Sequence, residues 1–374
     1  MPETRGAANQ TGLPGPDAAV RRGAANQARL PGPDAAVRRG AANQTGLPGP
    51  DAAVRYARNG DINIAFEDLG GAGGDPLLLV MGLGVSRLWW PPGLVGELIG
   101  HGFHVVAYDQ RDAGQSTHLP EAGSSSPIAA VLRRRSAAYS AEDMTDDAIA
   151  VLDALGWPSA HLFGHSMGGQ VAQRTALRHP GRVRSITSSA SLPSDVTGLK
   201  AARYVHAGLV ARFARLRFPE GHDGDIALGL AVARLVASPG YPFDEPEARA
   251  RIERDLASTT TNSGASSIRD TRAQSRQAGA KWHGARLREL RVPVLVLHGA
   301  ADPLLRPSAA RRTAAAIKDA RLLILPGVGH DLPKAVWPEV AAEVRALADR
   351  ANRTGPAQPS PAQCADDPAH HDDR

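Results

Sequence analysis

A serine between two glycines, Ser166 in the pentapeptide GHSMG at 164–168, is the residue from which a chemical function can be argued. The motif alone is weak, because glycine and serine are both common in turns. Here, however, an apolar segment at 160–164 precedes the serine and a helix-like segment at 168–178 follows it. The flanking glycines are needed because larger side chains would collide with the neighbouring strand and helix. A sharp strand-to-helix turn holds a hydroxyl clear of the sheet, so we interpret Ser166 as a nucleophile; a turn serine is the alternative.

A serine hydroxyl needs a base that takes its proton, and His330 is the best-placed of the 13 histidines. It lies in LLILPGVGHDLP, on a glycine-containing loop directly after the predicted strand at 322–325. In a parallel sheet that loop reaches the same end as Ser166. We predict that His330 is the base; a capping or turn histidine is the alternative.

The imidazole in turn needs a carboxylate that fixes its tautomer and stabilises its charged form. Asp302, in VLVLHGAADPLL, follows the predicted strand at 292–298 and is the first candidate. Asp195 is the second candidate, while Asp331 is disfavoured because it adjoins His330 and neighbouring side chains diverge. The chain order serine, acid, histidine is the one expected for this sheet topology.

Ester hydrolysis also needs hydrogen-bond donors for the oxyanion of the tetrahedral intermediate. We predict the backbone N–H groups of Met167, which follows the nucleophile, and of Leu83, in the segment MGLG after the strand at 77–81. Gly82 would let the backbone approach the reacting atoms. These donors are backbone groups, so their prediction rests on position and not on side-chain type.

Two aspartates in the segment YDQRDAGQST have a structural interpretation. Asp109 and Asp112 follow the predicted strand at 104–108, and we expect them, together with Ser116, to hold the loop after that strand.

Strands and helices alternate along the chain, which predicts a mostly parallel sheet with helices on both faces. One helical insertion at 193–285 breaks the alternation, and it contains helix-like segments at 201–213, 226–236 and 245–256. The other predicted strands are at 63–68, 77–81, 104–108, 160–164, 183–189, 292–298 and 322–325, and the other helices are at 91–100, 140–155, 168–178, 308–317 and 336–347.

The two ends of the chain differ from the rest. Residues 5–55 contain three copies of a 17-residue unit whose Leu-Pro-Gly-Pro centre and few apolar groups cannot repay the entropy of ordering, so 1–55 is predicted to be disordered. A polar tail at 353–374 is predicted to be disordered too. The sheet domain would therefore comprise 56–192 and 286–352.

Composition limits the classes of partner. The net charge of +5 is spread thinly, without a basic stripe, which argues against nucleic acid. No apolar run is long enough for a membrane span, and no apolar leader is present, so we expect a cytoplasmic protein. The single cysteine, Cys364, excludes an intramolecular disulfide and a cysteine-based metal site. The predicted serine chemistry requires neither metal nor organic cofactor, and the oligomeric state stays open.

With these residues in place, the chain from about 56 to 350 resembles the α/β-hydrolase family. Within it, the segments VMGLG, YDQRDAGQST, SPGYPFDE and GVGHDLP are similar to a bacterial carboxylesterase group related to anthracycline methylesterases. The resemblance implies that 193–285 forms a lid, whose apolar residues with Trp89 and Trp90 would line a pocket or belong to the core. Met81 stands where many members have a histidine, which leaves the backbone donor intact.

The expected function is hydrolysis of a carboxylic ester of a small apolar substrate through an acyl-serine intermediate. Lactone or thioester hydrolysis, or peracid formation, on the same three residues is the enzymatic alternative. A binding protein that keeps the fold without catalysis is the alternative from another class. Fold resemblance does not identify the substrate.

Overall fold

The computed structural model describes residues 53–119, 139–258 and 282–354. These ranges all belong to one compact unit. The predictions of disorder for 1–55 and 353–374 concern residues that lie outside the described ranges except at 53–55 and 353–354. The predicted boundaries differ there from the structure, in which a strand begins at Arg55 and the last helix ends at Thr354.

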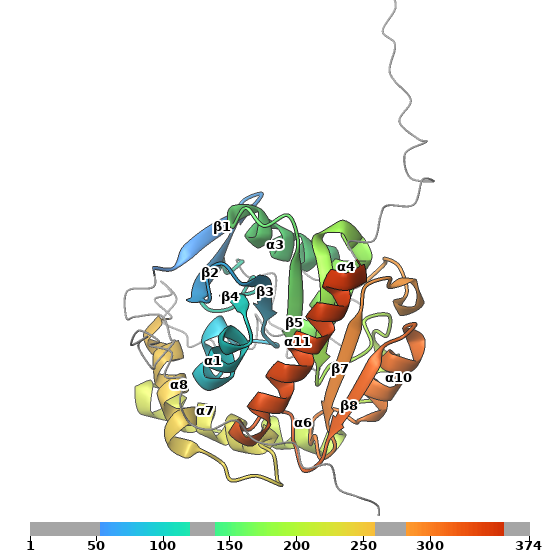
Figure 1. Ribbon diagram of the computed structural model, residues 1–374. Helices are drawn as coiled ribbons and strands as arrows, with labels where there is room; N and C mark the ends of the chain where they lie inside the picture. The colour runs from blue at the N-terminus through green and yellow to red at the C-terminus, as the bar shows by residue number, and fades with distance from the viewer. Residues whose placement is uncertain (1–52, 120–138, 259–281, 355–374) are drawn as a thin grey trace, which may run out of the picture. The chain divides into compact units, whose positions relative to one another are not determined.

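An 8-stranded sheet with the order β1-β2-β4-β3-β5-β6-β7-β8 forms the centre of the described residues (Figure 1). Strand β2 pairs antiparallel with β1 and β4, and every pairing from β4 to β8 is parallel. The strands are β1 (Arg55–Asn59), β2 (Ile62–Gly70), β3 (Asp75–Val80), β4 (Phe103–Tyr108), β5 (Ala160–His165), β6 (Val183–Ser189), β7 (Val294–Gly299) and β8 (Arg321–Leu325).

Helices cover both faces of the sheet, as the alternating pattern predicts. One apolar cluster joins the sheet to α1 and α11, and the other joins it to α3, α4 and α10. The helices outside the insertion are α1 (Pro92–Gly100), α3 (Ala141–Ala154), α4 (Met167–Arg178), α10 (Ser308–Ala316) and α11 (Trp337–Thr354), with short 3-10 turns η1 (Arg87–Trp89), η2 (Pro180–Arg182), η3 (Leu287–Glu289) and η4 (Lys334–Val336).

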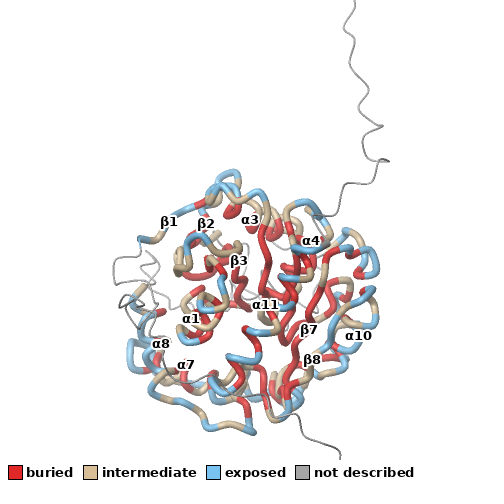
Figure 2. Tube along the Cα trace, viewed as in Figure 1, coloured by how far each residue is buried: buried red, intermediate tan, exposed pale blue. Residues whose placement is uncertain are grey.

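The central strands are largely buried because both of their faces are covered. Leu77 to Val80 in β3 are fully buried, and the central strands are drawn largely as buried in Figure 2. In the parallel register Val80 pairs with both Tyr108 and Gly164, so β3, β4 and β5 end at one edge. The loops that follow these strands therefore meet there.

The insertion between β6 and β7 contributes α5 (Leu199–Ala202), α6 (Ala207–Phe213), α7 (His222–Val236) and α8 (Glu245–Ser258). In Figure 1, α6, α7 and α8 lie beyond the carboxyl ends of the strands. The single helix predicted at 201–213 is wrong, because the chain leaves helical geometry between α5 and α6. There the His206 N–H donates to the Leu304 carbonyl and the Arg306 N–H to the Tyr204 carbonyl, so this backbone pairs with the loop after β7.

The loop after β4 is held as the sequence predicts. Asp109 accepts from the Gln115 N–H, and Ser116 Oγ donates to the Asp109 carbonyl over 2.7 Å. Asp112 Oδ1 accepts from the Leu119 N–H over 2.7 Å.

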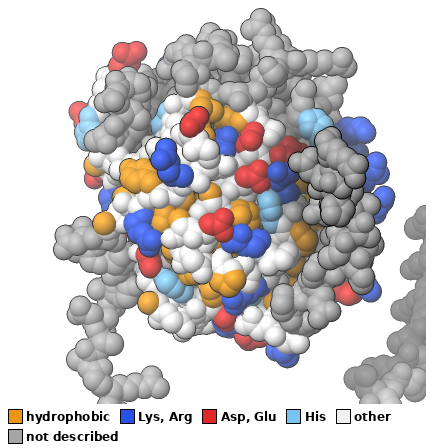
Figure 3. Space-filling view, turned by 90° about the horizontal axis from the view of Figure 1, so that it is seen from above, with side chains coloured by type: hydrophobic (Ala, Val, Ile, Leu, Met, Phe, Trp, Pro, Cys, Tyr) orange, Lys and Arg blue, Asp and Glu red, His pale blue; other side chains and the backbone are white. Residues whose placement is uncertain are grey.

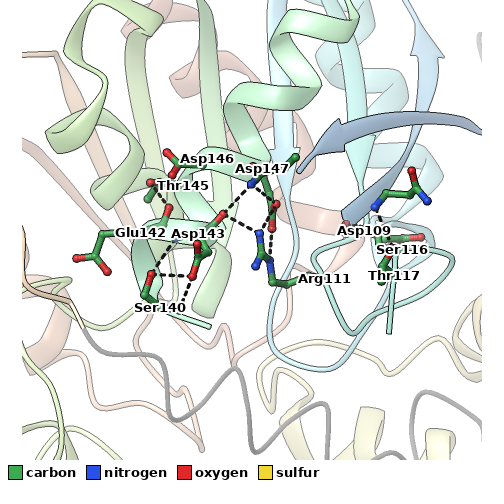
Figure 4. A network of polar contacts seen from close by, with 12 residues as sticks. Asp109, Arg111, Ser116, Thr117, Ser140, Glu142, Asp143, Thr145, Asp146 and Asp147 are labelled. Carbon is green, nitrogen blue, oxygen red and sulfur yellow. Dashed lines mark hydrogen bonds and ion pairs between the residues drawn. The ribbon is translucent and has the colours of Figure 1, made fainter. Parts of the chain in front are cut away.

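A buried ion pair also ties this loop to α3. Arg111 donates to both carboxylate oxygens of Asp147 over 2.6 Å, beside the capping box of Ser140 and Asp143 at the start of α3 (Figure 4). The loop after β4 is thus connected to α3.

The surface at the top of Figure 1 carries acidic, basic and apolar side chains interspersed (Figure 3).

Among the described helices, none combines the length and the apolar character that a bilayer span needs.

Candidate active site

Ser166 lies at the turn between β5 and α4, in the backbone conformation φ 55°, ψ −122°. Few residues other than glycine adopt it, and such strain persists where the surrounding structure enforces it. Here the Ser166 N–H donates to the Ser189 carbonyl over 2.8 Å, and the Ser166 carbonyl accepts from the Gly169 N–H over 3.0 Å. The turn is thus held at both ends, with the side chain at the edge of the sheet.

The flanking glycines are required for the reason the sequence predicts. A Cβ on Gly164 would lie 2.2 Å from the Gly168 carbonyl oxygen, and one on Gly168 would lie 2.0 Å from the Val80 carbonyl oxygen. Both distances are impossible for a side chain, so α4 packs against β5 and β3 only because these positions lack one.

The structure brings the three predicted side chains together. His330 Nε2 lies 3.0 Å from Ser166 Oγ, and His330 Nδ1 lies 2.8 Å from Asp302 Oδ2. An ionised carboxylate only accepts hydrogen bonds, so Nδ1 carries the proton and Nε2 is free to accept one from the serine hydroxyl. His330 is 7% exposed and Asp302 is 3% exposed, which shields these hydrogen bonds from water.

Asp302 is held as a carboxylate by its surroundings. Its Oδ1 accepts from the N–H groups of Leu304 and Leu305, each over 2.8 Å. Burial alone would raise the pKa of Asp302, but the His330 charge and hydrogen bond and the Leu305 N–H outweigh it, so the pKa lies below its usual range. The carboxyl group is therefore ionised at neutral pH.

The other candidate acids have different partners. Asp195 Oδ2 lies 3.6 Å from Arg312, and Asp331 Oδ1 accepts from Ser238 Oγ over 2.5 Å. Of these aspartates and Asp302, it is Asp302 that bonds to the His330 ring.

The loop after β3 passes directly over the serine. A Cβ on Gly82 would lie 3.1 Å from Ser166 Cβ, so the two segments are in contact. Gln110 Nε2 donates to the Met81 carbonyl over 2.5 Å and fixes the peptide before Gly82. Leu83 follows in this loop, and Met167 is the first residue of α4.

Two buried polar links in the loop after β3 were not predicted. Arg87 donates to Asp109 from its main chain and its side chain, each over 2.6 Å. Asp255, in α8 of the insertion, accepts from Ser86 Oγ over 2.5 Å and from Trp89 Nε1 over 2.9 Å. No local pattern marks the second link, since 169 residues separate Asp255 from Ser86.

Trp90 belongs to the core. Its ring packs edge-on against Phe163 at 5.1 Å between centroids, and it is buried. In the described part of the chain, no group of three or more His, Cys, Asp or Glu side chains is arranged to hold a metal ion.

The sheet order, the strained serine turn and the converging side chains define an α/β hydrolase. The model of the alpha/beta hydrolase fold family matches residues 75–333, and the chain belongs to this family. Among solved structures, the esterase RhEst1 from Rhodococcus sp. ECU1013 has a TM-score of 0.60 at 23% identity, covering 79% of this chain and 98% of that one. The meta-cleavage product hydrolase CumD from Pseudomonas fluorescens IP01 has a TM-score of 0.57 at 20% identity, covering 83% and 99%.

The proteins related in sequence indicate the type of enzyme more specifically than the solved structures do. The rhodomycin D methylesterase DnrP from Streptomyces peucetius is 30% identical over 305 residues, which cover 76% of this chain and 95% of the relative. The rhodomycin D methylesterase DauP from Streptomyces sp. strain C5 is 29% identical, covering 76% and 94%. A putative carbamate hydrolase RutD from Variovorax paradoxus is 39% identical over 32% of this chain and 40% of its own length. These relatives support an enzyme of the esterase type.

Proposed function

We propose that this protein hydrolyses a carboxylic ester through an acyl intermediate on Ser166. One observation carries the proposal: the continuous hydrogen-bonded series from Ser166 Oγ to His330 Nε2, at 3.0 Å, and from His330 Nδ1 to Asp302 Oδ2, at 2.8 Å. A weak nucleophile, a base and an acid that orients the base are the three groups that acyl transfer by serine requires.

In the first half of the reaction, Ser166 Oγ attacks the ester carbonyl carbon while His330 Nε2 takes the hydroxyl proton. The tetrahedral intermediate carries its negative charge on the former carbonyl oxygen. It collapses when the bond to the alkoxy group breaks, and His330 gives its proton to the leaving alcohol. Asp302 keeps the imidazole in the correct tautomer and stabilises its positive charge.

In the second half, a water molecule replaces the alcohol. His330 takes a proton from the water as it attacks the acyl carbon, and the second tetrahedral intermediate expels Ser166, which regains its proton. A carboxylic acid leaves and the enzyme returns to its starting state. The chemistry uses the same three side chains in both halves.

The oxyanion in both halves would be bound by the main-chain N–H groups of Leu83 and Met167. The contact between Gly82 and Ser166 supports the first donor, because it brings the loop after β3 against the nucleophile. The start of α4 supports the second donor, since the N–H groups at a helix N-terminus favour negative charge. Each such donor contributes about 3 kcal/mol to transition-state stabilisation.

For the substrate we propose a small, apolar carboxylic ester, with a methyl ester as the first class to test. The names of the two Streptomyces methylesterases support this choice. We also propose that the insertion between β6 and β7 acts as the lid and shapes the acyl pocket, since its helices lie beyond the strand ends that carry the three side chains.

A panel of p-nitrophenyl esters of increasing acyl length, together with a polycyclic methyl ester, tests the activity. The wild type should hydrolyse at least one member, and Ser166→Ala should lose nearly all turnover, about 10⁶-fold in kcat. Mass spectrometry of wild type quenched during turnover should find the acyl group on the peptide that contains Ser166.

Equal turnover by wild type and Ser166→Ala would refute the serine mechanism. Turnover of a lactone or a thioester but of no simple ester would move the activity to the enzymatic alternative. Binding of a methyl ester without turnover would instead favour a non-catalytic protein of this fold.

A further inference from the structure

The loop that carries His330 is bonded to the last residue of α7 in the insertion and to the segment that follows it. The His330 N–H donates to the Val236 carbonyl over 2.9 Å. Gly329 precedes His330, and its N–H donates to Ser238 Oγ over 2.7 Å. Asp331 follows His330, and its Oδ1 accepts a hydrogen bond from Ser238 Oγ over 2.5 Å. A single hydroxyl thus binds both neighbours of the histidine.

The backbones of the two segments are in direct contact here. A Cβ on Gly329 would lie 2.6 Å from the Ala237 carbonyl oxygen, and one on Gly240 would lie 2.7 Å from Gly327 Cα. The Gly240 N–H also donates to the Gly327 carbonyl over 2.9 Å. This proximity leaves little room for water, and Ser238 is only 5% exposed. Protein groups therefore have to satisfy the polar atoms between the segments.

We propose that Ser238 is a positioning residue for His330, and this inference rests on the proposed function. The hydroxyl uses its donor and one acceptor site on the two residues beside the histidine, so the loop has one preferred backbone arrangement. That arrangement sets the 3.0 Å separation of His330 Nε2 from Ser166 Oγ. The insertion therefore does more than cover the site, because it also aligns the base.

Removal of the hydroxyl has a definite structural consequence. Without Ser238 Oγ, the buried N–H of Gly329 loses its acceptor, and the loop has to move to find another one. Proton transfer from Ser166 to His330 depends on the distance and direction of one hydrogen bond. A displacement of about 1 Å can lower a rate by about a hundredfold.

The test compares Ser238→Ala and Ser238→Thr with the wild type. The readout is the rate constant at which diethyl p-nitrophenyl phosphate phosphorylates Ser166, measured across pH, with active sites counted by the burst of p-nitrophenol. A rate constant per active site does not depend on how much protein is folded. We expect Ser238→Ala to be slower by roughly tenfold to a hundredfold. Ser238→Thr, which keeps a hydroxyl, should lie between Ser238→Ala and the wild type.

Ser185→Ala is the matched control, because Ser185 is equally buried and binds a side chain, His161, over 2.8 Å near the start of β6. It should keep the wild-type rate constant and pH profile even if it is less stable. If Ser238→Ala does not fold, Ser238→Cys replaces it, since sulfur is a weaker hydrogen-bond partner, and it should be slower than Ser238→Thr.

A wild-type rate constant and pH profile in Ser238→Ala, or in Ser238→Cys if alanine prevents folding, would overturn the positioning role. Failure of the proposed function looks different, because the wild type would then not be phosphorylated at Ser166 at all.

Discussion

His298 Nε2 lies 3.4 Å from Asp302 Oδ2, the oxygen that accepts the hydrogen bond from His330. The same nitrogen bonds to the Leu305 carbonyl over 3.0 Å, so Nε2 carries the proton and donates it. Burial lowers the pKa of His298, which is therefore neutral at pH 7. A neutral imidazole thus supports the acid loop, since the Leu305 N–H in turn donates to Asp302.

Replacement of His298 should lower kcat when the new side chain cannot donate a hydrogen bond to the Leu305 carbonyl, and should have little effect when it can. His298→Phe leaves the Leu305 carbonyl without its partner and should lower kcat by roughly tenfold, the equivalent of one buried hydrogen bond. In His298→Gln the amide nitrogen can take the place of Nε2, and most activity should remain. The kcat of both variants on one p-nitrophenyl ester checks this, and equal values for the two variants would argue against the role.

If Asp302 is the acid, replacing Asp302 and Asp195 by asparagine should have very different effects on kcat. Asp302→Asn should lower kcat by about 10⁴-fold, because an amide cannot stabilise the protonated imidazole and favours the wrong tautomer. Asp195→Asn should leave kcat almost unchanged, since Asp195 faces Arg312 instead. Steady-state kinetics of both variants on one p-nitrophenyl ester decides the matter. The reverse pattern would make Asp195 the acid.

The hydrogen bonds of Asp255 connect α8 to the loop after β3, so a variant that lacks them should lose both stability and turnover. Asp255→Leu leaves the Ser86 hydroxyl and the Trp89 indole N–H without an acceptor, so the free energy of unfolding should fall by about 2 kcal/mol. The same loop carries the proposed donor Leu83, so kcat should fall as well.

Urea unfolding and ester kinetics measure the two effects of Asp255→Leu. Asp223→Leu, at an exposed position of α7, serves as the control and should show neither effect. A stability loss without any change in kcat would separate this link from the oxyanion site.

The strained backbone at Ser166 predicts that two inactive variants differ in stability. Glycine adopts a positive φ without the steric cost that a Cβ imposes, so Ser166→Gly should be more stable than Ser166→Ala by about 1 kcal/mol. Neither variant has a nucleophile, so activity does not complicate the comparison. Thermal unfolding checks it, and a less stable glycine variant would show that the turn carries no net strain.

The buried histidine of β5, His161, predicts how stability depends on pH. Burial lowers the pKa of His161 from 6.5 to about 4. Between these values the unfolded chain binds a proton that the folded chain does not, so acidification favours unfolding. The contribution is complete above about pH 6.5 and is lost as the pH falls towards 4. It amounts to about 3 kcal/mol at most.

His161→Gln should therefore flatten the loss of unfolding free energy between pH 7 and pH 4. His222→Gln, at an exposed position, is the matched control and should keep the wild-type slope. Chemical unfolding at several pH values gives both slopes, and equal slopes would contradict the expectation.

The positions of the proposed reacting groups could be predicted from the sequence because each follows a strand with a largely apolar sequence. A continuous apolar run identifies such a strand, and parallel strands bring their carboxyl ends together, so Ser166, Asp302 and His330 had to meet at one edge. The strand at 183–189 was predicted with its observed bounds, although its sequence, VRSITSS, mixes polar and apolar residues.

What sequence reasoning missed depends on contacts between distant segments. Strand β1 buries only Ala57, so it has no apolar alternation that could reveal it. The break between α5 and α6 arises because the backbone there pairs with a loop about a hundred residues later. Intrinsic helix propensity is a local property and does not depend on such a contact. Ser238 and Asp255 are single polar residues whose partners are 91 and 169 residues away.

The wide sequence separation of the proposed reacting groups also affects the newly made chain. Ser166 precedes His330 by 164 residues, and the strands β7 and β8 that position the acid and the base are the last two of the sheet. At 5 to 20 residues per second, a ribosome needs roughly 8 to 30 s to synthesise that interval. During this time the proposed nucleophile has no base, so under the proposed mechanism hydrolysis can begin only after the whole sheet has been synthesised and has folded.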